Sequence, residues 1–138
     1  TIALVAHDAK KDDLLKWVTE HADKLIGNNF YATGTTGKIL SAVLPNIQCL
    51  KSGPLGGDQQ LGALISEGKI DYLIFFWDPM TSQPHDVDVK ALLRLSVLYD
   101  VPTACNHASA DFLINSALFG KEYKSAPEDY SEYLNRSI

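Results

Sequence analysis

The run Tyr72-Leu73-Ile74-Phe75-Phe76-Trp77 has the strongest strand pattern in the sequence, because its six residues are all apolar or aromatic. Strands of this kind are typical of a parallel sheet that is covered on both faces. Shorter apolar runs occur at residues 2–6, 29–33, 47–51 and 101–106, and apolar residues recur at helical spacing between them. This alternation predicts an α/β fold with a parallel sheet of five strands and helices on both faces.

Size and composition predict one domain, residues 1–138, with a single core. The chain is 46% hydrophobic and 21% charged, which is typical of a globular protein. Its net charge of −5 argues against nucleic acid and acidic membranes as partners. No apolar run is long enough to cross a membrane. Cys49 and Cys105 lie in predicted strands, so we expect buried, reduced thiols in a cytoplasmic protein.

Residues with chemically active side chains follow the predicted strands directly. The carboxyl ends of parallel strands meet at one edge of a sheet, where ligands bind in folds of this class. We therefore expect a single site at this edge, built from His7, Asp8, residues 33–36, residues 52–58, Asp78 and His85.

The segment Thr33-Gly34-Thr35-Thr36-Gly37 is a candidate phosphate-binding loop. Glycines let the backbone curve around an anion, and threonine hydroxyls and helix N-terminal amides donate hydrogen bonds to it. The alternative is a tight turn that caps the next helix. Lys11 either meets the bound phosphate or is solvated, and His7 either makes a strand-end hydrogen bond or belongs to the site.

The segment Ser52-Gly53-Pro54-Leu55-Gly56-Gly57-Asp58 combines three glycines and a proline with an acid. Such a backbone can approach a ligand closely, and the acid can then accept a proton from that ligand. The alternative is a glycine–proline turn in which Asp58 caps the following helix.

The segment Pro84-His85-Asp86-Val87-Asp88 supplies a histidine and two acids ahead of a long helix. His85 can pass protons between substrate oxygens at neutral pH. If Asp88 converges with Asp58, the two carboxylates push their pKa values apart and one can serve as a base. We expect Asp86 instead to be a capping or first-turn acid of that helix.

Three further charged residues have a supporting role in this prediction. Asp8 and Asp78 each follow a strand at the same edge of the sheet, although Asp78 could equally hold a neighbouring loop. Arg136, in the polar tail, could reach a phosphate or a subunit boundary.

Several of these segments together resemble the methylglyoxal synthase family, and the similarity runs nearly end to end. The segment Gly56-Gly57-Asp58-Gln59-Gln60 is highly specific for this family. The other matching strings are Val5-Ala6-His7-Asp8, Tyr31-Ala32-Thr33-Gly34-Thr35-Thr36-Gly37, Phe75-Phe76-Trp77-Asp78-Pro79, Pro84-His85-Asp86-Val87-Asp88-Val89-Lys90-Ala91-Leu92-Leu93-Arg94 and Ala110-Asp111-Phe112.

The resemblance implies a Rossmann-like, three-layer fold and a homo-oligomer, with a hexamer favoured and a dimer or tetramer also open. It implies conversion of dihydroxyacetone phosphate to methylglyoxal and inorganic phosphate through an enediol or enediolate, without metal or organic cofactor. Inorganic phosphate, as the product, is expected to inhibit the enzyme.

The resemblance also implies a role for each site residue. Asp58 matches the catalytic base, Asp88 a supporting catalytic acid, and His85 a substrate-contacting position at which it can shuttle protons. The remaining substrate-binding positions are His7, Lys11, Thr33, Gly34, Thr35, Thr36, Ser52 and Gly53.

Two other function classes remain open at this stage. Regulatory domains of carbamoyl phosphate synthetase share the fold and bind effectors at the phosphate edge, but they would not need both Asp58 and His85. A sugar-phosphate isomerase would form the same enediol without releasing phosphate.

Overall fold

The strand predicted at residues 72–77 is β4 (Tyr72–Phe76), which pairs in parallel with β1 (Ile2–Ala6) over five residues, from Ile2–Tyr72 to Ala6–Phe76. A computed structural model describes residues 1–123, 125–127 and 130–135 of the chain. The predicted parallel sheet is confirmed: its order is β3-β2-β1-β4-β5, and every neighbouring pair is parallel. The remaining strands are β2 (Phe30–Ala32), β3 (Ile47–Cys49) and β5 (Thr103–Ala104).

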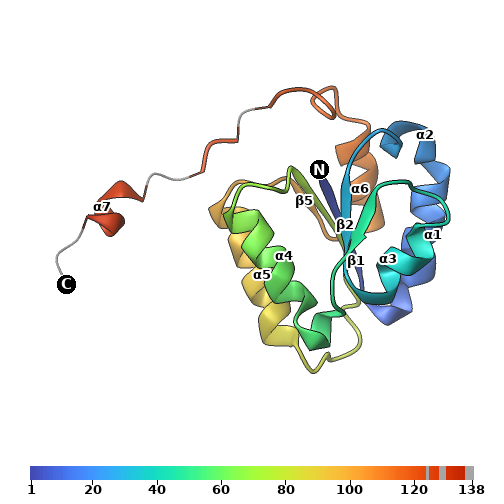
Figure 1. Ribbon diagram of the computed structural model, residues 1–138, viewed down its shortest axis with the longest axis horizontal. Helices are drawn as coiled ribbons and strands as arrows, with labels where there is room; N and C mark the ends of the chain where they lie inside the picture. The colour runs from blue at the N-terminus through green and yellow to red at the C-terminus, as the bar shows by residue number, and fades with distance from the viewer. Residues whose placement is uncertain (124, 128–129, 136–138) are drawn as a thin grey trace.

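Helices cover both faces of this sheet, which confirms the predicted three-layer arrangement (Figure 1). Helices α4 (Gly57–Ser66) and α5 (Asp86–Leu98) pack on one face. The other face carries α1 (Lys11–Glu20), α2 (Ala22–Leu25), α3 (Gly34–Leu40) and α6 (His107–Ile114). None of the helices in the described residues is long and apolar enough to cross a membrane.

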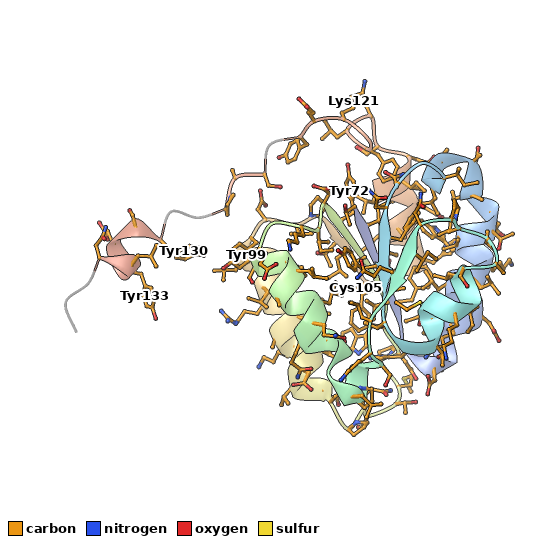
Figure 2. The ribbon with its side chains drawn as sticks, viewed as in Figure 1. Tyr72, Tyr99, Cys105, Lys121, Tyr130 and Tyr133 are labelled. Carbon is orange, nitrogen blue, oxygen red and sulfur yellow. The ribbon has the colours of Figure 1, made fainter. Side chains whose placement is uncertain are left out.

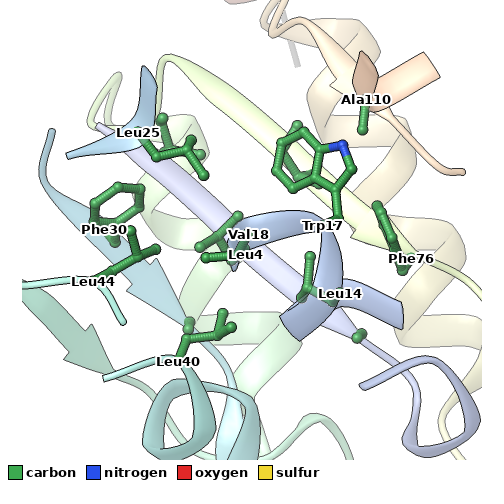
Figure 3. Close-up of a cluster of buried hydrophobic side chains, with 14 of the residues drawn as sticks. Leu4, Leu14, Trp17, Val18, Leu25, Phe30, Leu40, Leu44, Phe76 and Ala110 are labelled. Atoms are coloured by element: carbon green, nitrogen blue, oxygen red, sulfur yellow. The ribbon is translucent and has the colours of Figure 1, made fainter. Parts of the chain in front are cut away.

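The larger of the two cores lies under α1, α2, α3 and α6, and Figure 3 shows part of it. Trp17 is its largest side chain and is only 1% exposed. The indole packs beside Phe76 of β4, and its Nε1–H donates to Asp111 Oδ1 of α6 at 2.9 Å. This contact ties α1 to both the sheet and α6, while the second core joins α4 and α5 to the opposite face.

Three details differ from the sequence-based expectation. The segment between β1 and β2, where the helical spacing of apolar residues indicates a helix, is divided into α1 and α2 by a turn at His21. The last strand is only two residues long and begins directly after Pro102, which has no N–H to donate to the sheet. Cys49 is exposed, because β3 is an edge strand, so the expectation of a buried thiol is wrong for this residue. Cys105 follows β5 and is half-buried rather than fully buried.

The chain after α6 is fastened to the end of the sheet before it continues to α7 (Ser131–Leu134), which stands away from the sheet in Figure 1. Tyr72, labelled in Figure 2, packs against the Phe119 ring with centroids 4.9 Å apart. Its hydroxyl accepts a hydrogen bond from the Gly120 N–H at 3.2 Å. Arg136 lies outside the described residues.

The start of α4 depends on a close backbone approach that only glycine allows. A Cβ added to Gly57 would lie 1.9 Å from the Lys51 carbonyl oxygen, so backbone would have to move. We expect Gly57→Ala to lower the free energy of unfolding by about 2 kcal/mol or more, measured by urea denaturation. The control is Gly62→Ala in the same helix, where the nearest atom is the flexible Leu95 Cδ1. Equal stability of the two variants would contradict this account.

Candidate active site

A cavity of about 270 Å³ lies at the carboxyl ends of the strands, at the edge where the sequence predicts the site. The structure brings eleven of the predicted residues onto its wall: His7, Asp8, Lys11, Thr33, Gly34, Thr35, Thr36, Ser52, Gly53, Asp58 and His85. The wall also includes Gln83, which the sequence did not single out because it lies in an irregular segment without a motif.

The threonine segment forms one side of this cavity as the first turn of α3. Thr33 is the residue before the helix and makes no capping hydrogen bond with its side chain. Gly34 has φ +50° and packs against Ser52, where an added Cβ would lie 2.9 Å from the Ser52 Cα. Thr36 is buried, and its hydroxyl has no hydrogen-bond partner among the described residues. An anion in the cavity would provide that partner.

A tight turn carries the chain from Ser52 into α4 and so positions Asp58. The Ser52 carbonyl accepts hydrogen bonds from the N–H groups of Leu55 and Gly57, at 3.0 and 2.9 Å. Gly56 has φ +102° and occupies the position before the helix, which no side chain caps. The alternative in which Asp58 caps α4 is therefore wrong, because Asp58 is the second residue of that helix.

Asp58 and His85 face each other at the base of the cavity, both nearly fully buried. The Asp58 Oδ2 and His85 Nε2 atoms are 3.4 Å apart, and neither Asp58 Oδ2 nor His85 Nδ1 has a hydrogen-bond partner in the described chain. Burial raises the pKa of Asp58 above its ordinary value of 3.8; His85 opposes this rise, and the negative charge of Asp88 adds to it. Gly53 passes directly over the pair, since a Cβ there would lie 2.6 Å from His85 Nε2.

His7 and Lys11 approach the cavity from the end of β1. The His7 ring is 5% exposed and makes an edge contact with the His85 ring, with centroids 6.0 Å apart. Lys11, the first residue of α1, forms an ion pair with Asp8, and its side chain is 17% exposed. That ion pair lowers the pKa of Asp8 and leaves the Lys11 ammonium at the cavity wall.

Two predicted acids lie outside the cavity. The Asp78 carboxylate points to its own turn, where it accepts a hydrogen bond from the Met80 N–H at 3.0 Å, and the Asp78 N–H donates to His7 Nδ1. Asp88 lies behind Asp58 in a groove between α4 and α5. Asp86 Oδ1 accepts from the Gln83 N–H at 3.1 Å, which holds the loop before α5.

No group of three or more His, Cys, Asp or Glu side chains among the described residues could hold a metal ion. The cavity instead offers hydroxyl and amide donors on one side and a carboxylate with two histidines on the other. This arrangement can bind a small anion and move a proton next to it.

Comparison with known proteins gives a consistent assignment. The family model described as "MGS-like domain" matches residues 13–105. Methylglyoxal synthase from Hahella chejuensis (strain KCTC 2396) is 55% identical over 139 residues, covering 100% of this chain and 90% of that protein. The protein of the same name from Yersinia pestis (strain Pestoides F) is 54% identical over 138 residues, covering 99% and 90%.

Among solved structures, the crystal structure of methylglyoxal synthase from Elizabethkingia anophelis NUHP1 matches with a TM-score of 0.92. The two chains are 54% identical, and the match covers 99% of this chain and 91% of that one. Because its sequence is more than half identical to these proteins over nearly its full length and its fold is the same, the chain belongs to the methylglyoxal synthase family of lyases.

Proposed function

We propose that the chain converts dihydroxyacetone phosphate to methylglyoxal and inorganic phosphate. The observation that carries the proposal is the buried Asp58–His85 pair, 3.4 Å apart, at the base of a cavity whose wall also carries hydroxyl and cationic side chains that can bind an anion. At about 270 Å³ the cavity is small and suits a three-carbon phosphate ester better than a nucleotide.

The phosphate group binds at the threonine side of the cavity. Thr36 supplies an unpartnered hydroxyl, the first turn of α3 supplies backbone N–H groups, and Ser52 and Gly53 form the opposite edge. Lys11 provides a positive charge that the protein as a whole, with net charge −5, does not.

Asp58 removes a proton from the hydroxymethyl carbon beside the carbonyl. The electrons of the C–H bond form a carbon–carbon double bond, and the carbonyl oxygen becomes negatively charged. A carboxylate with a raised pKa is a stronger base once it is ionised, so burial suits Asp58 to this step. His85 lies beside Asp58 and stabilises the enediolate by donating a hydrogen bond or a proton to its oxygen.

Phosphate then leaves as the second half of the reaction. His85 moves the proton of the hydroxyl on the deprotonated carbon to the former carbonyl oxygen. The oxygen left without its proton then forms an aldehyde C=O, the carbon–carbon double bond shifts to the carbon that bears the phosphate, and the C–O bond to phosphate breaks. The resulting enol loses its hydroxyl proton and gains one at the terminal carbon, which gives methylglyoxal. This cleavage needs the C–O bond perpendicular to the enediolate plane, so the threonine and Ser52–Gly53 segments orient the phosphate as well as bind it. The proposed reaction uses no cofactor.

The chain's assembly, location and regulation are part of the same proposal. Exposed apolar side chains such as Val97 and Phe112, both 81% exposed, support a homo-oligomer, for which the family resemblance favours a hexamer. We propose a cytoplasmic enzyme that its product, inorganic phosphate, inhibits by occupying the donors meant for the substrate phosphate.

The direct test is incubation with dihydroxyacetone phosphate, followed by assays for free phosphate, methylglyoxal and glyceraldehyde phosphate. The proposal requires the first two products in equal amounts. Glyceraldehyde phosphate without free phosphate would indicate an isomerase, and tight binding without any product would indicate an effector-binding module.

Replacing the base tests the mechanism. We expect Asp58→Asn to lower kcat by about 10²- to 10⁴-fold, while inorganic phosphate still binds in calorimetry. Burial raises the pKa of Asp58, so the protonated carboxyl is favoured in the folded parent. Its contribution to the free energy of unfolding is fully present below pH 3.8 and is lost as the pH rises through the raised pKa. The Asn variant should therefore be more stable than the parent at neutral pH. The matched control is Asp12→Asn, the exposed second residue of α1, and turnover of Asp58→Asn within about tenfold of the parent would refute the assignment.

The pH profile tests the electrostatic part of this mechanism. The acid limb of kcat/KM should lie above the ordinary aspartate value of 3.8, since activity is lost as pH falls through the raised pKa of Asp58. Asp88→Asn removes a charge that raises this pKa, so the limb should move to lower pH. Asp86→Asn, on the same helix, should leave the limb in place, and a limb unmoved by Asp88→Asn would exclude the proposed coupling.

Removing the unpartnered hydroxyl of Thr36 should have opposite effects on the stability of the free protein and on its affinity for phosphate. Thr36→Val keeps the shape of the side chain and removes a buried group that lacks a partner, so the free protein should be more stable by about 1 kcal/mol. Phosphate affinity should fall by about tenfold or more, because a hydrogen bond to a charged group is lost. Thr19→Val, at an exposed hydroxyl bonded to the Leu15 carbonyl, should change neither quantity, and unchanged affinity in Thr36→Val would contradict the binding role.

A further inference from the structure

The two buried histidines of the cavity have different hydrogen-bond partners. His85 has no partner at Nδ1 among the described residues and stands 3.4 Å from Asp58 Oδ2 through Nε2. His7 receives a hydrogen bond at Nδ1 from the Asp78 backbone N–H at 3.0 Å, in a buried position. A backbone N–H can only donate, so His7 Nδ1 must present its lone pair.

This contact decides where His7 carries its proton. A neutral imidazole with a lone pair on Nδ1 has its proton on Nε2, and a protonated imidazole would set two N–H groups against each other. His7 Nε2 is buried, has no hydrogen-bond partner in the described chain, and belongs to a ring on the cavity wall. A free N–H donor is therefore held ready for a ligand.

We propose that the Asp78 backbone N–H holds His7 neutral with its proton on Nε2, making His7 a fixed hydrogen-bond donor and leaving proton transfer to Asp58 and His85. The identity of the acceptor, an oxygen of the substrate, rests on the proposed function. A neutral imidazole that donates in this way polarises a carbonyl and stabilises the enediolate that forms from it.

Asp78 acts here as a positioning residue. Its carboxylate accepts a hydrogen bond from the Met80 N–H at 3.0 Å and so closes a turn directly after β4. The backbone N–H of His7 donates a hydrogen bond to the Phe76 carbonyl oxygen at 3.2 Å, which keeps the ends of β1 and β4 together. The turn and the strand pairing together aim the Asp78 N–H at the ring.

The charged surroundings of His7 are mixed. Lys11 and His85 disfavour a positive charge on the ring, whereas Asp78 and Asp86 favour one. Burial is the largest influence, and the pKa of His7 is lowered below its ordinary value of 6.5. These effects agree with the hydrogen-bond geometry, which stands without them.

His21 provides a matched comparison within the same chain. Its Nδ1 lies 2.8 Å from the Trp17 carbonyl oxygen, which can only accept, so His21 must carry a proton on Nδ1. The two histidines are therefore expected to have opposite protonation at Nδ1.

The test is a two-bond ¹H–¹⁵N correlation spectrum of the ¹⁵N-histidine-labelled protein, with the His7 signals assigned by their loss in His7→Gln. We expect His7 to show an unprotonated Nδ1 and a protonated Nε2, and to stay so as the pH is lowered through 6.5, while His21 shows a protonated Nδ1. A protonated His7 Nδ1 at neutral pH would overturn the proposal. Because the spectrum needs no substrate, absence of methylglyoxal formation would refute the proposed function and leave this result standing.

A matched pair of variants tests the role of the Asp78 turn. Asp78→Asn and Asp78→Ala both remove the charge, but only Asn can still accept the hydrogen bond from Met80. We expect Asp78→Asn to keep the parent His7 spectrum and a kcat within about twofold of the parent. Asp78→Ala should show His7 protonating as the pH falls through 6.5, with kcat lowered about tenfold or more. Identical His7 spectra in the two variants would remove Asp78 from the positioning role.

Discussion

The site depends on the five-residue parallel pairing of β1 with β4, which puts Ala6 level with Phe76 at the carboxyl ends of both strands. The chain continues from β1 towards one edge of the sheet and from β4 towards the other, so a crevice opens between the two connections. His7 comes directly after β1 and Asp78 shortly after β4, and the shared register brings the histidine ring to the Asp78 N–H. A shift of the β1–β4 register by one residue would turn the side chains of one strand to the opposite face of the sheet and break this hydrogen bond.

The cavity concentrates polar atoms that the fold leaves unsatisfied. His7 Nε2, Thr36 Oγ1, Asp58 Oδ2 and His85 Nδ1 are the buried side-chain atoms without a hydrogen-bond partner in the described chain, and their residues all line this one cavity. Each such atom destabilises the free protein, by about 1–3 kcal/mol for a group that burial strips of water. The two hydrophobic cores that flank the sheet offset this cost, and a bound ligand would remove it. Stability and function are therefore opposed at these four positions.

The parallel sheet was predictable from the sequence, because apolar runs and the residues that end them indicate where each strand begins and ends, and most of the residues expected at the site do line one cavity. The sequence could not predict that the Asp78 contribution to the cavity comes from its backbone N–H, or that Asp88 lies behind Asp58. Residue type indicates what a side chain can do, but the direction of a backbone group is set by tertiary pairing. For the same reason, the place of Gln83 on the cavity wall was not predictable from the sequence. The apolar residues around Cys49 did not show that this strand lies at the edge of the sheet.

The position of Asp58 is what separates an enzyme from an effector-binding module. A buried carboxylate in this cavity would repel the phosphate that the proposed function places there, so it would weaken binding. Such a group is useful only if it interacts more favourably with the transition state than with the bound substrate. A base meets this condition, since its negative charge is lost as it takes the proton. Under the proposed function, the negative charge of the substrate phosphate would raise the proton affinity of Asp58 further, so the repulsion that weakens binding would also strengthen the proposed base.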